Sequence, residues 1–294
     1  MQTAGPEYLK QTPLVVGLMR LPEHRALHSP GALADWITQC LDDGLEVFDH
    51  ADIYGDGECE RLFGRALRAT PHLKHKVKLI SKAGIVLKHQ DTSPWRSKHY
   101  RAEAGYISAA IDASLQRLQV DRLHTFLIHR PDPLLEAPAL ARVLEQAVES
   151  GKVGHIGVSN FLPEQWRWLQ QNTHLPLVCN QSELSLGHPQ PLFDGGLEAM
   201  LSDRLRWLAW SPLAGGKLPE RIPEQLLTNA QWETGLCETG LAIAWIRQLP
   251  GAPIPVIGSL RSDRLQAASR GAQADLPRGL WYALLEAVQG NPVP

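Results

Sequence analysis

The chain reads GHIGVSNFLPEQWRWLQQ from Gly154 to Gln171. The residues from Gly154 to Asn160 form a short apolar run, which predicts a buried strand. The segment from Pro163 to Gln171 has a helical hydrophobic period and predicts an amphipathic helix. A buried strand followed at once by a helix is the repeating unit of α/β folds.

The same unit recurs along the whole chain. The other predicted strands are Leu14 to Arg20, Glu46 to Ala51, Val77 to Ser81, His124 to Arg130, Leu177 to Glu183, Arg206 to Leu213 and Pro255 to Ser259. The other amphipathic segments are Ala32 to Leu41, Glu60 to Arg68, Ala104 to Leu118, Pro138 to Ser150, Gly195 to Ser202, Thr239 to Gln248 and Asp263 to Ser269. Eight strands that alternate with eight helices predict an α/β fold, a single (β/α)8 TIM barrel in one domain of residues 1–294.

Two intervals between strand starts are overlong, at 47 and 49 residues, against about 30 for a simple strand-helix-strand unit. The excess lies after the third strand, in Lys82 to Arg101, and after the seventh, in Ala214 to Gln231. Because substrate sites are built at the carboxyl ends of barrel strands, both long loops are candidate pocket walls. An extra C-terminal helix, Leu280 to Val288, has no strand after it and could cover the barrel.

Composition narrows the class of protein. Of 294 residues, 44 % are hydrophobic and 20 % charged, and the formal net charge is −2. These values exclude a disordered chain and give no electrostatic footprint for nucleic acid. No apolar run is long enough to cross a bilayer, so no membrane partner is expected.

The cysteines and the N-terminal residues indicate a compartment. The segment from Met1 to Lys10 carries no apolar core of the kind that a secretory signal requires. The cysteines are scattered without a C-x-x-C pair, at Cys40, Cys59, Cys179 and Cys237. We therefore expect a cytoplasmic protein with neither a disulfide framework nor a metal site.

Four polar residues follow predicted strands that a barrel would bring together: Asp49, Tyr54, Lys82 and His129. A lysine directly after a buried strand needs a partner, and Asp49 on the neighbouring strand supplies one. A cation beside the Tyr54 hydroxyl would lower the phenol pKa from about 10 toward working pH. The result would be a proton donor suited to carbonyl reduction. The plainer alternative is that Asp49 and Lys82 only close the barrel end, while Tyr54 and His129 pack.

Two other interpretations of this region fail. The segment Gly55-Asp56-Gly57 lacks the third glycine of a dinucleotide fingerprint, and no helix opens at the right offset. The neighbouring acidic residues are of the type found in a calcium-binding loop, but their spacing does not match the EF-hand pattern. These residues are Asp49, Asp52, Asp56, Glu58 and Glu60.

The segment FDHADIYG from Phe48 to Gly55, with Glu58 and Phe63-Gly64 downstream, resembles the signature of the aldo-keto reductases. Further matching segments follow in the family's order: LIHRPDP from Leu127 to Pro133, GKVGHIGVSNF from Gly151 to Phe161, Asn180-Gln181, and WSPL from Trp210 to Leu213 with Gly215-Gly216. The chain is similar to the family's bacterial branch of predicted oxidoreductases. The resemblance implies a nicotinamide-dependent carbonyl reductase on the barrel already inferred.

Carried over to this chain, the resemblance makes Tyr54 the general acid that protonates the carbonyl oxygen while hydride arrives from the nicotinamide. Lys82 would lower the Tyr54 pKa, Asp49 would hold Lys82, and His129 would orient the carbonyl. One alternative is a cofactor-binding redox sensor or regulatory subunit with little turnover. Another is a sugar-phosphate isomerase on the same fold, which would bind no nicotinamide.

The resemblance also implies the cofactor contacts. Ser159, Asn160 and Gln181 match the carboxamide-binding positions, and Trp210 stands where many members stack a tyrosine on the nicotinamide. Ser211 and Leu213 match positions whose backbone lines the pyrophosphate. The full predicted set is Met19, Arg20, Ser159, Asn160, Gln181, Trp210, Ser211, Leu213, Gly215, Ser259 and Arg264.

Cofactor choice depends on the segment after the eighth strand. There Gly258 stands where many members have lysine, and Ala267 and Ala268 replace an acid and an amide that often hold adenine. Ser259 and Arg264 nevertheless suit the 2′-phosphate of NADPH, and Asp263 is expected to cap the following helix. We therefore expect NADPH as cofactor, NADH as a weaker one, and a small-molecule carbonyl compound as the partner.

Overall fold

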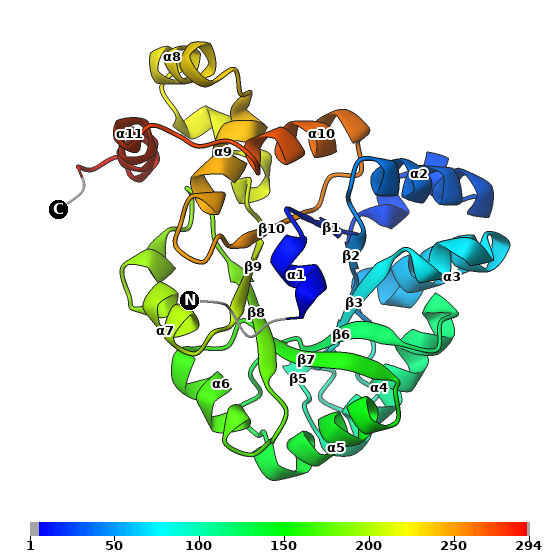
Figure 1. The fold of residues 1–294 in the computed structure, drawn as a ribbon. Coiled ribbons are helices and arrows are strands. Elements are labelled where there is room, and N and C mark those ends of the chain that lie inside the picture. Colours follow the sequence, from blue (N-terminus) through cyan, green and yellow to red (C-terminus); the bar gives the residue numbers. More distant parts are fainter. Residues whose placement is uncertain (1–5, 293–294) are drawn as a thin grey trace.

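In residues 6–292, which the structure, a computed structural model, describes, eight parallel strands pair side by side and close into a barrel (Figure 1). Around the barrel their order is β1-β10-β9-β8-β7-β6-β3-β2. Their bounds are β1 Val15–Gly17, β2 Val47–Asp49, β3 Lys78–Ala83, β6 Leu123–Ile128, β7 Val153–Ser159, β8 Leu177–Glu183, β9 Arg206–Trp210 and β10 Ile254–Ile257. Parallel neighbours require crossover connections, and the helices supply them.

A helix follows each barrel strand, so the predicted (β/α)8 fold is confirmed. These helices are α2 Pro30–Asp42, α3 Glu58–Ala69, α4 Ala104–Leu118, α5 Ala137–Glu149, α6 Pro163–Gln170, α7 Gly196–Ser202, α9 Glu238–Arg247 and α10 Ser262–Gly271. Both α4 and β8 have the predicted bounds. The first predicted strand is too long, because only Val15–Gly17 pairs with its neighbours.

The core has two parts because both faces of a parallel sheet are buried. One face of the strands fills the barrel interior with Val15, Val47, Ile80, Leu127, Cys179, Leu208 and Val256. The other face packs against the helices with residues such as Val16, Phe48, Leu79 and Phe126. Side chains two residues apart on a strand therefore point the same way, into the barrel or toward the helices.

A short helix that the sequence did not predict, α1 Glu7–Gln11, closes the amino end of the barrel (Figure 1). Its Leu9 is fully buried among the interior side chains. The Tyr8 hydroxyl forms a hydrogen bond with Thr125, near the start of β6. The N-terminal segment thus fills the space that the strands leave at this end.

The predicted C-terminal helix exists, as α11 Arg278–Gln289, but it does not cover the barrel. It packs outside the helical layer, where Trp281 stacks on Trp245 of α9 with ring centroids 4.8 Å apart. Each of these indoles donates a hydrogen bond to the backbone carbonyl of the other tryptophan. This contact holds α11 against α9 on the outside of the molecule, so the expectation that it could cover the barrel is wrong.

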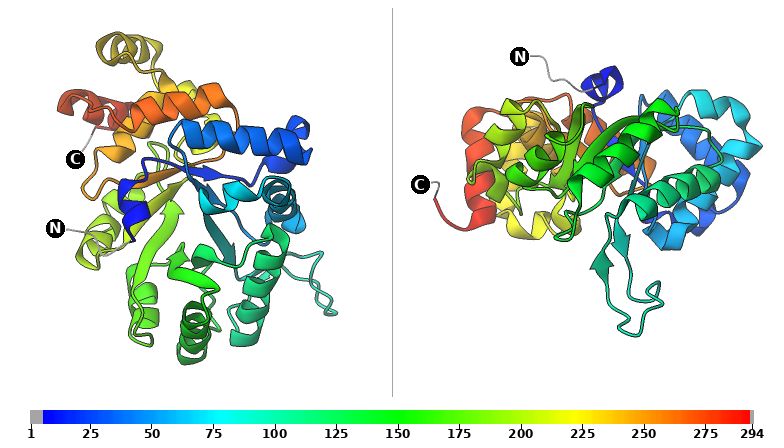
Figure 2. Two further views of the ribbon diagram at one scale, coloured as in Figure 1. Left: turned by 45° about the vertical axis from the view of Figure 1, so that its right-hand side comes forward. Right: turned by 90° about the horizontal axis from the view of Figure 1, so that it is seen from below.

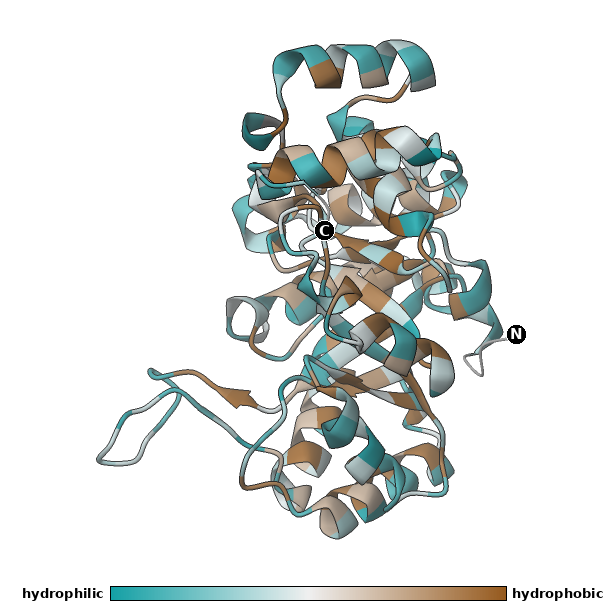
Figure 3. Cartoon of the chain, turned by 90° about the vertical axis from the view of Figure 1, so that its left-hand side faces the viewer, coloured by the Kyte–Doolittle hydropathy of each residue, from teal (hydrophilic) through white to brown (hydrophobic). Residues whose placement is uncertain are grey.

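The two long loops also contain structure. The first forms a hairpin of β4 Ile85–Val86 and β5 His99–Tyr100. It projects from the face of the barrel opposite α1 (Figures 2 and 3). The second was predicted as a loop to Gln231, but it includes most of a helix, α8 Glu224–Thr234.

No helix between residues 6 and 292 combines the length and the apolar character needed to cross a bilayer. Residues 1–5 and 293–294 lie outside the described part of the chain. They include half of Met1 to Lys10, the segment predicted to lack a secretory signal. The single domain of residues 1–294 therefore stays a prediction.

Candidate active site

The carboxyl ends of the barrel strands carry a layer of polar side chains. Each lies two residues after a side chain of the barrel interior, so each points into the same end of the barrel. Asp49 follows Val47, Lys82 follows Ile80, and Gln181 follows Cys179. The same two-residue step leads to His129, to the half-buried ring of Trp210, and to Gly258.

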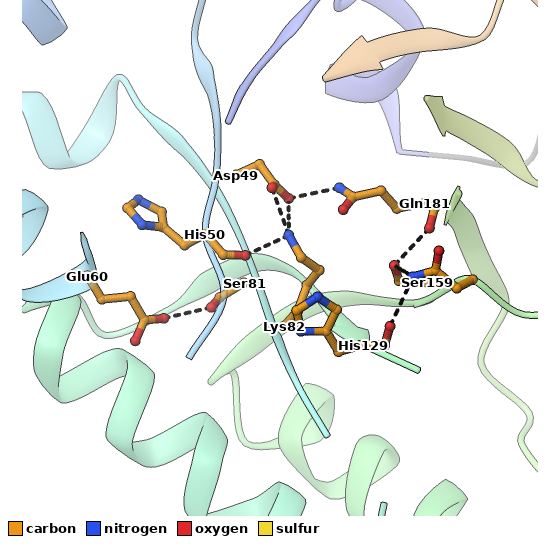
Figure 4. Close-up of polar contacts among 9 residues, drawn as sticks. Asp49, His50, Glu60, Ser81, Lys82, His129, Ser159 and Gln181 are labelled. Atoms are coloured by element: carbon orange, nitrogen blue, oxygen red, sulfur yellow. Dashed lines mark hydrogen bonds and ion pairs between the residues drawn. The ribbon is translucent and has the colours of Figure 1, made fainter. Parts of the chain in front are cut away.

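Lys82 lies at the centre of this layer (Figure 4). Its ammonium donates to both oxygens of Asp49, at 2.6 and 2.7 Å, and to the backbone carbonyl of His50 at 2.8 Å. Gln181 donates its side-chain amide to the same carboxylate at 2.9 Å. Lys82 has no exposed surface and Asp49 has 1 %. The pairing that the sequence predicted is therefore present, with the His50 carbonyl as an additional acceptor.

Tyr54 stands beside this ion pair. It begins a turn, η3 Tyr54–Gly57, directly after β2, and φ is positive at Gly55, Asp56 and Gly57. Glycine adopts these angles without strain, and aspartate tolerates them better than most residues. The turn places the Tyr54 ring centroid 5.0 Å from the Lys82 ammonium. The His129 ring meets the Tyr54 ring edge to face, with centroids 6.2 Å apart.

The predicted lowering of the Tyr54 pKa is not found. Burial raises the pKa of the phenol above its ordinary value, the Lys82 ammonium lowers it by a smaller amount, and Asp49 raises it further. Burial opposes the charge on Lys82, but Asp49 raises the pKa of that ammonium above its ordinary value. Burial also lowers the pKa of His129 well below its ordinary value. At neutral pH the site therefore holds a neutral phenol, an ammonium and a neutral imidazole.

Ser159 and Asn160 extend the polar layer along β7. The Ser159 hydroxyl donates to the backbone carbonyl of Gln181 at 2.8 Å. The Asn160 amide donates to Ser159 Oγ at 2.9 Å and to the His129 carbonyl at 3.2 Å. Trp210 Nε1 donates to Asn160 Oδ1 at 3.0 Å. Positive φ at Asn160, 62°, turns the chain so that its amide lies in this network.

The other predicted cofactor residues lie around the layer. Met19 and Arg20 are exposed in the segment after β1. Ser211 and Leu213 are half-buried after β9, and a side chain built at Gly215 would meet no atom within 4 Å. Ser259 and Arg264 lie after β10, and Arg264 is exposed. Within residues 6–292, no hydrogen bond joins this outer group to Asp49 or Lys82.

The segment between β10 and α10 departs from expectation in one respect. Asp263 does not cap the helix, because it lies inside α10 and its carboxylate binds Arg261. The two oxygens accept from Arg261 Nε at 3.0 Å and Nη2 at 2.6 Å. The guanidinium of Arg264 has no hydrogen-bond partner within the described residues. Arg264, in the first turn of α10, lies close enough to Asp263 to help lower the pKa of that carboxyl.

A second polar cluster, which the sequence analysis missed, lies on the helix side of β3. Ser81 donates to the fully buried Glu60 at 2.6 Å, and Arg117 Nε donates to the other oxygen of Glu60 at 2.6 Å. The sequence does contain one signal for this cluster. Ser81 precedes Lys82 on the strand, and because neighbouring strand residues point to opposite faces, its hydroxyl must find a polar partner on the helix side. Figure 4 shows Ser81 and Glu60 on the opposite side of the strand from Gln181.

Comparisons with known proteins identify the family of this chain. A family model described as "Aldo/keto reductase family" matches residues 13–278. The chain is 37 % identical over 295 residues to "Uncharacterized oxidoreductase YcsN" of Bacillus subtilis (strain 168), covering 98 % of both chains. It is 35 % identical over 288 residues to "6-dehydroglucose reductase" of Agrobacterium fabrum, covering 97 % of both chains.

Among solved structures, an aldo/keto reductase from Klebsiella pneumoniae in complex with NADP and acetate has the same fold. Its TM-score is 0.77 at 24 % sequence identity, covering 96 % of this chain and 93 % of that chain. The sequence match and the closed barrel lead to one conclusion. The chain belongs to the aldo/keto reductase family of oxidoreductases.

Proposed function

We propose that the protein reduces aldehydes or ketones to alcohols with NADPH, and that Tyr54 is the general acid. One observation carries the proposal: the Tyr54 phenol lies beside a lysine that is fully buried and bound to Asp49. Tyr54 is partly exposed, so a carbonyl oxygen can reach it, whereas Lys82 has no exposed surface. Lys82 therefore acts through Tyr54 and is a positioning residue.

Each residue has a defined task in this proposal. When bound, the nicotinamide supplies the hydride, and Tyr54 supplies the proton to the carbonyl oxygen. Because burial raises the Tyr54 pKa, the phenol holds its proton through neutral pH. The cation of Lys82 favours the phenolate that forms when the proton leaves. His129, neutral because burial lowers its pKa, can donate a hydrogen bond that orients the carbonyl.

The residues present fit a nicotinamide cofactor. Ser159, Asn160 and Gln181 bring a hydroxyl and two amides to one side of the barrel end, and a primary amide can bind to such groups. The half-buried Trp210 ring offers an adjacent aromatic face. The turn after β9, with positive φ at Gly215, leaves its backbone open to a ligand.

NADPH is favoured over NADH by the segment after β10. Arg264 carries a guanidinium without a hydrogen-bond partner in the described chain, and a 2′-phosphate suits such a group. Ser259 lies five residues before Arg264 and offers a hydroxyl. The Klebsiella pneumoniae structure was solved with NADP, which supports the same choice.

For the substrate, the relative named 6-dehydroglucose reductase makes an oxidised sugar the first class to test. We also infer that the protein works in the cytoplasm, where thiols stay reduced. Cys40, Cys59 and Cys179 are buried free thiols, which suits a reducing compartment.

The test is Tyr54→Phe, which removes only the hydroxyl. We expect kcat for 4-nitrobenzaldehyde and for 6-dehydroglucose to fall by about 10² to 10⁴, the usual contribution of a general acid. NADPH affinity, read from tryptophan fluorescence, should stay within about twofold of the unmodified protein, well below the tenfold that 1.4 kcal/mol represents. Tyr282→Phe, at a tyrosine on α11, is the matched control and should leave both quantities unchanged.

Two results would contradict the proposal. Near-normal kcat in Tyr54→Phe would remove Tyr54 as the proton donor. An unmodified protein that binds NADPH but reduces neither compound would instead favour the redox sensor or regulatory subunit.

A further inference from the structure

The helix side of β3 carries a closed network of charged groups directly behind Lys82. Glu60 has no exposed surface and binds the Ser81 hydroxyl and the Arg117 guanidinium, each at 2.6 Å. Ser81 precedes Lys82 on the strand. Glu60 lies in the first turn of α3, which begins directly after the Tyr54 turn. The network therefore joins the two segments that carry Tyr54 and Lys82.

Asp52 is the second carboxylate of this network. Its backbone N–H donates to the carbonyl of Lys82 at 2.9 Å, and it stands two residues before Tyr54. Its side chain faces Tyr106 of α4, and burial first and the Asp52 charge second raise the pKa of that phenol. Its Oδ1 atom is inaccessible to solvent and has no hydrogen-bond partner in the described structure. Asp52 thus contacts the backbone that positions Lys82.

The charges in this region do not balance when every group is ionised. Asp52 is faced by Glu60 from α3, by Arg117 and Tyr106 from α4, and by Lys82 from β3. Lys82 is already neutralised by Asp49, so two carboxylates share the single guanidinium of Arg117. Burial first, and the Glu60 charge second, raise the pKa of Asp52 to about 7.

We propose that Asp52 is a positioning residue for the Tyr54–Lys82 pair, and that its neutral and ionised forms hold this pair in states of different activity. This inference rests on the proposed function, because it takes Tyr54 as the general acid and Lys82 as the cation that acts through it. Neutral Asp52 leaves Glu60 and Arg117 as a balanced pair. Ionised Asp52 adds an uncompensated negative charge behind Lys82, which makes Tyr54 a weaker acid.

A direct measurement of Asp52 does not need turnover. Infrared difference spectra between pH 5 and pH 9 should show a protonated carboxyl band that is lost near pH 7. The band should be absent in Asp52→Asn, which replaces the carboxyl with a neutral group of the same shape. Asp112→Asn, at an exposed aspartate of α4 paired with Lys152, is the charge-matched control and should keep the band.

The second measurement is the pH dependence of carbonyl reduction. In the unmodified protein, kcat should fall about three- to tenfold as the pH rises through 7, which corresponds to a barrier increase of about 0.6 to 1.4 kcal/mol. Asp52→Asn should stay near the low-pH value and lose this step. Tyr106→Phe replaces the hydroxyl that faces the carboxylate with an apolar group, which favours the neutral form, and should move the step to higher pH. A purely structural role would change the rate without moving the step.

The outcomes separate the two proposals. Two results would overturn this inference and leave the proposed function intact. One is a protonated-carboxyl band that is still lost near pH 7 in Asp52→Asn, and the other is the same pH profile of kcat in Asp52→Asn and the unmodified protein. Near-normal kcat in Tyr54→Phe would overturn the proposed function and this inference with it. If Asp52→Asn does not fold, an unmoved step in Tyr106→Phe would overturn the inference.

Discussion

At the scale of single residues, the site depends on the burial of one cation. Lys82 can stay charged without exposed surface because its three protons have acceptors in Asp49 and the His50 carbonyl. Removal of one partner of such a pair leaves a buried charge, which is costly. The lysine therefore has a fixed place, and Tyr54 is held against a fixed charge.

The cofactor prediction also belongs to this scale. Arg264→Ala should weaken NADPH binding about ten- to a hundredfold, because a hydrogen bond to a charged group contributes about 1.5 to 3 kcal/mol. NADH lacks the 2′-phosphate and should lose much less. Binding of NADPH should also become less sensitive to salt. Fluorescence titration of the tryptophans with each cofactor measures all three effects.

A second arginine of the same segment is the control. Arg261 is held by Asp263, so Arg261→Ala should affect NADPH less than Arg264→Ala. If Arg264→Ala weakens the binding of NADPH and NADH equally, the arginine does not bind the 2′-phosphate.

At the scale of elements, the hairpin of β4 and β5 is attached to the Tyr54 turn. Asp56 of that turn accepts hydrogen bonds from His89 Nε2 and Gln90 Nε2, both at 2.8 Å. Both donors lie in the hairpin loop, between the two strands. The loop that the sequence marked as a pocket wall is therefore connected to the turn that presents Tyr54.

Loss of this connection should loosen the hairpin. We predict that trypsin cleaves the loop at Lys88, Arg96 or Lys98 about two- to fivefold faster in Asp56→Gly. Glycine adopts the positive φ of this position without strain, so the substitution removes only the side-chain contact. An exposed pair contributes up to about 1 kcal/mol, and cleavage follows the open population. Asp56→Asn keeps an acceptor oxygen and should be cleaved near the normal rate. Equal cleavage of all three proteins would show that the contact does not hold the loop.

At the scale of the whole molecule, burial holds several histidines in their neutral form. Burial lowers the pKa of His50 to about 3 and that of His124 to about 4, and it lowers that of His129 well below its ordinary value. Unfolded histidine takes up a proton near pH 6.5. The stability that these groups provide is therefore present above pH 6.5 and is lost as the pH falls toward 4.

We predict that the urea concentration at the unfolding midpoint decreases as the pH is lowered from 6.5 to 4.5. Asp52 acts in the opposite direction, because its raised pKa stabilises the fold at low pH and this contribution is lost as the pH rises through about 7. His50→Phe keeps a ring against Phe63 and should reduce the acid loss by up to about 1.4 kcal/mol per pH unit. His72→Phe, at an exposed position, should not. A midpoint that does not change with pH would contradict the prediction.

The barrel could be predicted because its signals are local. Each strand is a short apolar run with a helix after it, and the two-residue alternation along strands places Asp49 and Lys82 on the inner face without knowledge of distant contacts. The pairing of these two residues followed because a buried lysine requires a partner. The family motifs added the expectation that Tyr54 and His129 lie at the same end of the barrel.

Other features depend on contacts between distant segments, which no local pattern encodes. An amphipathic pattern shows that α11 has an apolar face, but only the tertiary structure shows that its Trp281 stacks on Trp245 of α9. The Tyr54 pKa is raised, contrary to expectation, because its direction is the balance between burial and one nearby cation. The sequence identified the cation, but the extent of burial is set by packing from several elements, so only the tertiary structure decided the direction.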